Sequence, residues 1–472
     1  MKAQKAQASF ALEKEEIPTL IFGGRSHLGY AAALIMSLGR DAAGARAWLS
    51  AILPEISFGH VKSAQAVAVA FTHTGLTRLG LPYDDLLTFP TAFQSGMTSP
   101  GRSRALGDEG ASDPKKWRWG GQTECDAILI VYADSAEALQ RLHADHHGKI
   151  TDNGGKILYE IQLAPRVGEM REPFGFVDGV SQPFVAGTPR AAGKPAAAVT
   201  PAGAFVLGYD GPSGYQAISP TIPASRDPSA ILPALRDVDG TACRDLGRNG
   251  SFFVVRQLRQ DVEGFNKYLE RAAESLAAQG VMPNIPEKQQ TEWVAAKLLG
   301  RWRNGASLVN HPDQPGREPD NAFMFAAEDR LGLACPVGSH IRRANPRDSL
   351  TQDPQESLLI TGRHRLLRVG RPYHPQEEEK CPGTLFMCLN ADIEMQFETV
   401  QQSWLNRPDF RGLRNEPDPM TAGTGNTNYT IPTPHGPGRL PNLPSFVTTI
   451  GGSYFFMPSR AALRYMASLT GG

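Results

Sequence analysis

The chain has 472 residues, more than one hydrophobic core usually supports, so two domains are expected. Hydrophobic residues make up 41% of the chain, enough for substantial cores, and 48 basic residues balance 48 acidic ones. This balance argues against a nucleic-acid partner, because dedicated nucleic-acid binders carry a basic surface.

No apolar run approaches the roughly 20 residues that span a bilayer, so no membrane partner is expected. Charges occupy residues 1–17, where a signal peptide would have its apolar region. We expect a cytoplasmic protein as the sequence stands, or a secreted one if a leader was removed. The cysteines are odd in number, widely scattered and without a CxxC pair: Cys125, Cys243, Cys335, Cys381 and Cys388. A disulfide framework and a thiolate zinc site are therefore not expected.

Four segments share one local plan, a short apolar strand that turns into an amphipathic helix: residues 67–80, 126–147, 251–276 and 384–404. In the second, residues 128–132 (ILIVY) predict a buried strand. Asp134 predicts the N-cap of the following helix, with Glu137 three residues later as in a capping box. Further along that helix, His143, Asp145, His146 and His147 could form a metal cluster, but ordinary polar residues near a helix C-terminus are the simpler interpretation.

Further strands are predicted near residues 156–163 and 448–457. Two strand–helix units in each half, with these strands, predict a split βαβ arrangement that occurs twice. The predicted fold class is therefore α+β, with two ferredoxin-like domains built from antiparallel sheets with flanking helices. Because residues 186–233 are rich in Ala, Pro and Gly, we place the boundary there and assign residues 1–200 and 201–472 to the two domains.

Three ordered motifs stand out: residues 174–183 (FGFVDGVSQP), 336–348 (PVGSHIRRANPRD) and 368–373 (RVGRPY). The first two also have ordinary local interpretations. Asp178 precedes Gly179, a pair typical of a turn. A lone histidine such as His340 is usually structural, and the following Arg342 and Arg343 could form a solvated face.

Together the three motifs resemble the GxxDG, HIRRxNPR and RxGxPY segments of the dye-decolorizing peroxidases. The resemblance extends from about residue 67 to residue 459, since residues 383–404 and 450–458 also read like family segments. It implies haem b, held mainly by the C-terminal domain. No CxxCH motif for covalent attachment is present, so non-covalent binding is expected.

The resemblance also assigns roles to residues of this chain. It implies that His340 binds the haem iron on the proximal side. Asp178 would be the distal acid–base catalyst, and Arg368 would stabilise developing negative charge beside it. Many relatives supply a carboxylate to the proximal histidine, but residues 452–454 (GSY), where we would look for it, contain no acid.

Other roles follow from the same motifs. Arg347, the last arginine of HIRRxNPR, would bind a haem propionate. Leu385 and Phe386 would lie over the haem and keep the distal pocket dry. Tyr373 and Trp404 are candidate surface oxidation sites for dyes too bulky to enter the pocket.

The implied activity is that of a haem peroxidase, in which hydrogen peroxide forms a ferryl intermediate that oxidises aromatic or dye reductants in one-electron steps. Two alternatives remain open at this point, a haem-processing enzyme that releases iron and a haem carrier or sensor without turnover. A carrier would need only His340 and an apolar slot, so the presence of Asp178 and Arg368 favours the enzyme. The sequence leaves a homo-oligomer open.

Overall fold

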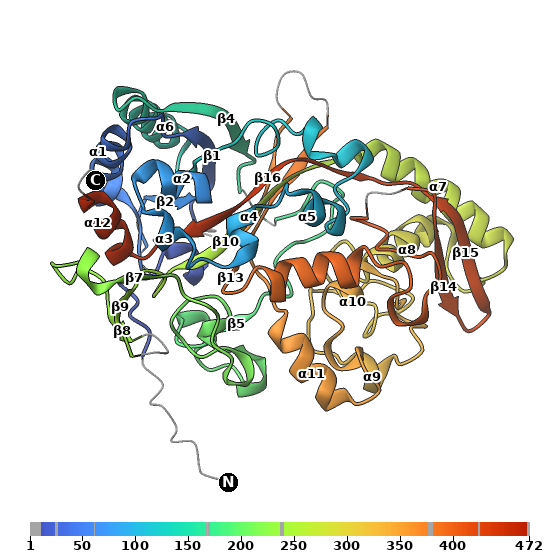
Figure 1. The fold of residues 1–472 in the computed structure, drawn as a ribbon. Helices are drawn as coiled ribbons and strands as arrows, with labels where there is room; N and C mark the ends of the chain where they lie inside the picture. The colour runs from blue at the N-terminus through green and yellow to red at the C-terminus, as the bar shows by residue number, and fades with distance from the viewer. Residues whose placement is uncertain are drawn as a thin grey trace, which may run out of the picture.

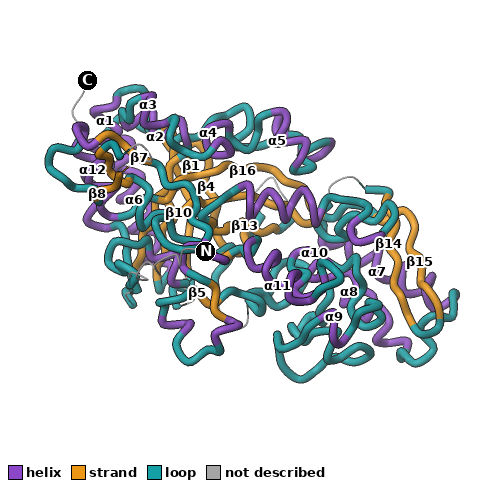
Figure 2. The backbone as a smooth tube through the Cα atoms, turned by 60° about the horizontal axis from the view of Figure 1, so that its bottom comes forward, coloured by secondary structure: helices purple, strands orange, loops and turns teal. Residues whose placement is uncertain are grey.

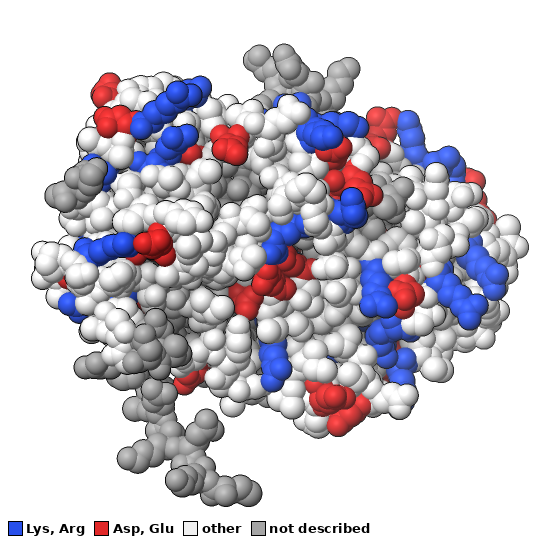
Figure 3. Space-filling model, in the orientation of Figure 1, with Lys and Arg blue, Asp and Glu red and all other residues white. Residues whose placement is uncertain are grey.

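The computed structural model describes residues 11–23, 27–60, 62–166, 168, 170–236, 240–375, 381–422 and 425–469. Residues 1–10, which carry part of the charge that argued against an export signal, lie outside the described residues. None of the described helices is long and apolar enough to cross a membrane. On the face in view, acidic and basic side chains are interspersed (Figure 3).

The N-terminal half forms a ferredoxin-like unit of antiparallel strands in the order β2-β3-β1-β4. Its elements are β1 (Tyr30–Ser37), α1 (Ala42–Ile52), β2 (Gln65–Phe71), β3 (Ala127–Ala133), α6 (Ala136–Asp152) and β4 (Lys156–Leu163). The strand–helix unit that opens this half is therefore β1–α1, which the sequence patterns missed. The predicted cap of α6 is wrong by one residue, because the side chain of Ser135, not Asp134, accepts the N–H of Ala138.

The C-terminal half repeats this arrangement. Strand β10 lies between β16 and β13, and β11 and β12 pair with the other edge of β13. The elements are β10 (Ser251–Gln260), α7 (Val262–Ala278), β11 (Leu367–Arg368), β12 (Arg371–Tyr373), β13 (Gly383–Asn390), the π-helix η11 (Glu394–Leu405) and β16 (Val447–Met457). The predicted α+β class with a duplicated ferredoxin-like order is confirmed.

The two halves join into one nine-stranded sheet. Phe456 of β16 pairs with Phe71 of β2, and Tyr373 of β12 pairs with Leu163 of β4, so strands of the two halves meet at both edges. The strands gather at the centre of the molecule in Figure 2. The domain boundary at residue 200 stays a prediction.

Alternate residues of each central strand belong to different cores. Ile35 of β1 and Val255 of β10 share one buried cluster, while the adjacent Leu34 and Val254 belong to another. Both faces of the sheet are therefore covered, which explains why these strands read as continuous apolar runs instead of alternating patterns.

The remaining elements surround the sheet. Helices α1 and α6 lie at one end of the molecule, and α7, α8 and the hairpin β14–β15 lie at the other (Figure 1). The other long elements are α8 (Glu287–Leu299), α11 (Pro354–Arg363), β14 (Thr427–Thr433), β15 (Gly436–Leu443) and α12 (Arg460–Ser468). The short ones are α2 (His73–Leu79), α3 (Tyr83–Leu86), α4 (Thr91–Ser95), α5 (Pro100–Ala105), β5 (Phe184–Val185), β6 (Val199–Thr200), β7 (Thr221–Pro223), β8 (Ala234–Arg236), β9 (Ala242–Asp245), α9 (Phe325–Glu328) and α10 (His340–Ala344).

Candidate active site

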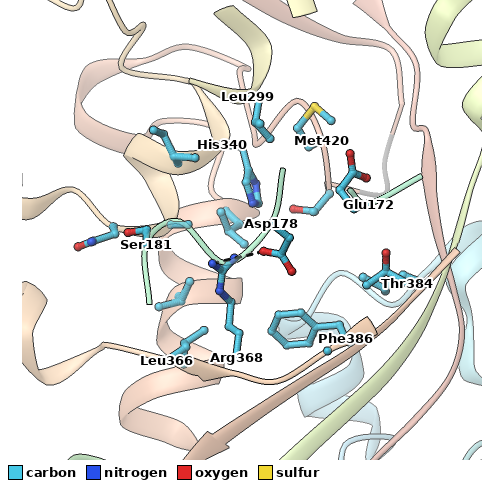
Figure 4. A pocket seen from close by; sticks show the side chains of 18 of the residues that line it. Glu172, Asp178, Ser181, Leu299, His340, Leu366, Arg368, Thr384, Phe386 and Met420 are labelled. Carbon is cyan, nitrogen blue, oxygen red and sulfur yellow. Dashed lines mark ion pairs between the residues drawn. The ribbon is translucent and has the colours of Figure 1, made fainter. Parts of the chain in front are cut away.

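A cavity of about 320 Å³ brings the three sequence motifs together. Asp178 and Ser181 reach it from the first motif, His340 from α10, and Arg368 from β11 (Figure 4). Its lining is largely apolar, with side chains that include Phe174, Phe176, Leu258, Leu299, Ile341, Leu366, Phe386, Phe397, Val400, Leu405, Met420 and Val447. Apolar walls with a few convergent polar groups are typical of a cofactor site.

His340 is held by a buried carboxylate. Its Nδ1 lies 3.0 Å from Oδ2 and 3.2 Å from Oδ1 of Asp418, which is 2% exposed. Asp418 also accepts the N–H groups of Met420 and Thr421 at 3.0 and 2.7 Å. Burial by itself would raise the pKa of Asp418, but the neighbouring His340 and Arg343, with a hydrogen bond from the Thr421 hydroxyl, hold the pKa below its usual value. An acceptor on Nδ1 orients the ring and leaves Nε2 for a metal.

Asp418 is the acidic partner that the sequence did not identify. The expected place, residues 452–454, instead lies in β16 of the central sheet. Asp418 stands in a loop between Pro417 and Pro419, in a stretch without helical or strand periodicity, so no local signal marked it.

Asp178 and Arg368 form an ion pair in the cavity, with 3.6 Å between Oδ1 and Nη2 (Figure 4). Both side chains are about a third exposed, at 35% each. A residue that the sequence reasoning missed, Gln182, connects their segments. Its side-chain amide donates to the carbonyl oxygen of Arg368 at 2.8 Å and accepts the Arg368 N–H at 3.2 Å. These two bonds attach the first motif to β11.

Of the two residues expected over the cofactor, only Phe386 lines the cavity. Leu385 is fully buried on the opposite face of β13, in the cluster that also contains Phe253 and Val255. The prediction for Leu385 is therefore wrong, since consecutive strand residues point to opposite faces.

The basic run after His340 is not a solvated face, because Arg342 and Arg343 are 0% exposed. Arg342 pairs with Asp329 at 3.0 Å, and Arg343 donates to backbone carbonyls that include that of Glu416, at 2.9 Å. Both arginines therefore connect the segment that follows His340 to other parts of the chain.

Arg347 does not itself line the cavity. Its guanidinium lies over the ring of Phe323, 3.7 Å from the centroid, and donates to the carbonyl oxygens of Asn321 and Phe323 at 3.0 and 2.6 Å. Burial lowers its pKa to about 9, and nearby Arg301 and Arg365 contribute to the shift. The predicted contact of Arg347 with a propionate stays a prediction.

Arg301 and Arg365, in contrast, line the cavity. Burial lowers the pKa of each to about 10. Arg301 donates to Asn321 Oδ1 at 2.8 Å. Among the described residues, none accepts a hydrogen bond from the side chain of Arg365. A half-buried cation that lines a largely apolar cavity is costly unless an anion pairs with it.

The two proposed surface sites are buried. Tyr373 is 2% exposed and Trp404 is 6% exposed, so neither presents its ring to solvent as predicted. The cause is the same for both, because β12 and η11 pack their aromatic side chains inward. Trp404 nevertheless contacts His364, which lines the cavity, with ring centroids 5.0 Å apart.

The histidine cluster on α6 does not require a metal. Asp145 and His146 do lie near Glu55, but the Nζ of Lys149 pairs with both Glu55 and Asp145. The chain therefore supplies its own cation at this place. The predicted position near a helix C-terminus is wrong, because α6 continues to Asp152.

The cavity contains a histidine that is hydrogen-bonded to a carboxylate, apolar walls, and a carboxylate–guanidinium pair. This is the residue set of a haem peroxidase. The comparisons agree with this class. The chain is 29% identical over 445 residues to the dye-decolorizing peroxidase msp1 of Mycetinis scorodonius, with 86% of this chain and 77% of the relative covered. It is also 29% identical to the multifunctional dye peroxidase DyP2 of Amycolatopsis sp., with 90% of each covered.

Among solved structures, an ancestral D-type dye-decolorizing peroxidase superposes with a TM-score of 0.76 at 26% identity, with 98% of this chain and all of that chain covered. A dye-decolorizing peroxidase in complex with 2,6-dimethoxyphenol superposes with the same TM-score at 23% identity and 97% coverage of this chain. No protein-family model matches the chain. The similarity to dye-decolorizing peroxidases that the motifs predicted is confirmed.

Proposed function

We propose that the chain is a haem-dependent peroxidase of the dye-decolorizing type, which uses hydrogen peroxide to oxidise aromatic donors and dyes. The observation that carries the proposal is one cavity that contains His340, oriented by Asp418, together with the Asp178–Arg368 pair. The similarity to characterised dye peroxidases over most of the chain supports it.

The residues of the cavity fit haem b held without a covalent bond. His340 Nε2 would bind the iron, and Leu299, Met420 and Phe386 would pack against the macrocycle. Arg365, for which no described residue supplies an anion, would pair with a propionate, with Arg301 beside it. None of the cysteines lines the cavity. When bound, haem would supply the redox chemistry that lets peroxide oxidise a donor by one-electron steps.

Residues of the chain would transfer the proton and stabilise the developing charge. Asp178 would take a proton from the inner oxygen of hydrogen peroxide at its carboxylate and return it to the departing outer oxygen. Arg368 would stabilise the negative charge that develops there without losing its own proton. Asp418 would keep His340 as a strong electron donor by accepting its Nδ1–H.

Two other functions would use part of the same site. A haem carrier or sensor would need the His340 side of the cavity, but would have no use for the Asp178–Arg368 pair. A haem-processing enzyme would release iron from the bound group. The ion pair at 3.6 Å favours peroxidase activity over the carrier.

One experiment separates the three functions. The protein is loaded with haem, mixed with one equivalent of hydrogen peroxide in a stopped-flow spectrometer, and then supplied with 2,6-dimethoxyphenol or an anthraquinone dye. A peroxidase changes the Soret band within seconds and then restores it as the donor is oxidised. A haem protein that oxidises donors no faster than free haem contradicts the proposal, and release of free iron with loss of the Soret band indicates haem processing.

A further inference from the structure

A second carboxylate, that of Glu172, lines the same cavity as Asp178 (Figure 4). Glu172 opens a tight hairpin whose other arm ends at Asp178. Arg171 and Val177 form an antiparallel bridge, and the N–H of Glu172 donates to Phe176 O at 2.9 Å. At the tip, Gly175 has a φ of 93°, a conformation that other residues rarely adopt.

The side chain of Glu172 holds this hairpin from within. Its Oε2 accepts the N–H of Phe174 at 3.0 Å, and its Oε1 accepts the N–H of Phe176 at 3.0 Å. Without the carboxylate, these two amides would lose their acceptor next to the buried rings of Phe174 and Phe176.

Glu172 also connects the hairpin to the central sheet. The side-chain amide of Gln260, on β10, donates to Glu172 Oε2 at 2.7 Å, and its oxygen accepts the hydroxyl of Thr384, on β13, at 2.7 Å. No lysine or arginine of the described segments forms an ion pair with Glu172. Burial raises its pKa, while the amides of Phe174 and Phe176 and the Gln260 side chain work in the other direction. The negative charge of Asp178 adds to the effect of burial, so the pKa of Glu172 stays above its usual value despite these three donors.

We propose that Glu172 is a positioning residue for Asp178, because it fixes the hairpin that carries Asp178 to the sheet that carries Arg368 and Phe386. The inference rests on the proposed function. It adds a residue that acts through the placement of the Asp178 carboxylate. Misplacement of a reacting group by about 1 Å can cost about 100-fold in rate.

The test compares haem-loaded wild type with Glu172→Ala, Glu172→Gln, Asp178→Asn and the double variant Asp178→Asn/Glu172→Ala. Glu172→Ala should slow the reaction with hydrogen peroxide about ten-fold or more, with unchanged haem content. In the Asp178→Asn background, the same change should lower the rate of the peroxide reaction by less than about two-fold, since the effects of residues that act as a unit are not additive. The rate of Glu172→Gln should lie between those of wild type and Glu172→Ala, because its amide keeps one acceptor oxygen. Equal losses in the two backgrounds, or a wild-type rate in Glu172→Ala, would overturn the proposal.

Hydrogen exchange gives a readout that does not depend on turnover. The amides of residues 174–176 should exchange faster in Glu172→Ala than in wild type, and unchanged exchange there also contradicts the proposal. Asp227→Asn is the matched control, since Asp227 accepts the N–H groups of Ile231 and Leu232 at 3.0 and 2.8 Å and does not line the cavity. It should raise exchange near residue 231 without slowing the peroxide reaction. Failure of the wild type to bind haem or react with peroxide would instead refute the proposed function.

Discussion

Nδ1 of His340 lies 3.0 Å from a carboxylate oxygen of Asp418, a residue 78 positions later in the chain. The pair joins the helix α10 to an irregular loop, and Asp418 is the more deeply buried partner. A carboxylate at this place makes the imidazole a stronger electron donor and fixes the direction of its free nitrogen. The proximal side of the cavity is therefore built from two segments, although the motif marks only one.

His340→Ala should purify with little or no haem, because the substitution removes the nitrogen proposed to bind the iron. The measurement is the haem-to-protein ratio, from the pyridine haemochrome assay and the Soret absorbance. A haem content and Soret band equal to those of wild type would show that another residue supplies the axial bond.

Asp418→Asn should retain haem but raise its reduction potential, because a neutral amide makes His340 a weaker donor to the iron. A loss of about 10–100-fold in haem affinity or activity is expected. Potentiometric titration of the ferric/ferrous couple measures the shift. Glu416→Gln is the control, since Glu416 lies in the same loop but accepts bonds from the N–H and hydroxyl of Thr430 instead. An Asp418→Asn potential equal to that of Glu416→Gln contradicts the prediction.

Asp178→Ala and Arg368→Leu should each slow the reaction with hydrogen peroxide by about 100- to 10,000-fold while the protein stays loaded with haem. The physical reason is the loss of a proton acceptor in one variant and of a fixed positive charge in the other. Stopped-flow mixing over a range of peroxide concentrations gives the rate constants. The double variant should be little worse than the slower single variant, and rates equal to wild type in both single variants would remove the pair from the mechanism.

Arg365→Leu should weaken haem binding by about ten-fold, the value of one charge-assisted hydrogen bond to an anion. Transfer of haem to an excess of apomyoglobin reports the change as a faster rate of loss. Arg363→Leu is the matched control, because Arg363 lies two residues earlier and is exposed. If both variants lose haem at the wild-type rate, Arg365 does not pair with a propionate.

Trp404→Phe should lower the turnover of large anthraquinone dyes and leave the peroxide reaction and small phenolic donors unchanged. Although buried, Trp404 contacts the cavity-lining His364, so an electron from a dye at the surface could reach the cavity through it. We expect a smaller effect from Tyr373→Phe, since Tyr373 packs in the core between β-strands. Steady-state rates with both classes of donor provide the test. If both variants and their double oxidise large dyes as fast as wild type, a direct route at the cavity must carry the electron.

The sequence by itself determined the features that depend on neighbouring residues. Apolar runs predicted strands β3, β10 and β13, because a strand covered on both faces is apolar along its length. Three short, contiguous motifs predicted the family, and they predicted Asp178, His340 and Arg368 as site residues. Chain-local patterns also predicted the duplicated strand–helix order, except for β1–α1.

Tertiary structure alone decided which residues meet across long sequence distances. Asp418 in a loop, Gln182 beside Arg368 and Glu172 beside Gln260 carry no periodic signal, because hydrogen bonds between distant segments depend on how the chain is packed. Tertiary structure also decided the face of a strand on which a given side chain lies. Leu385 and Phe386 are adjacent and both apolar, yet only pairing of β13 with β10 determines which face of the strand meets the buried core and which meets the cavity.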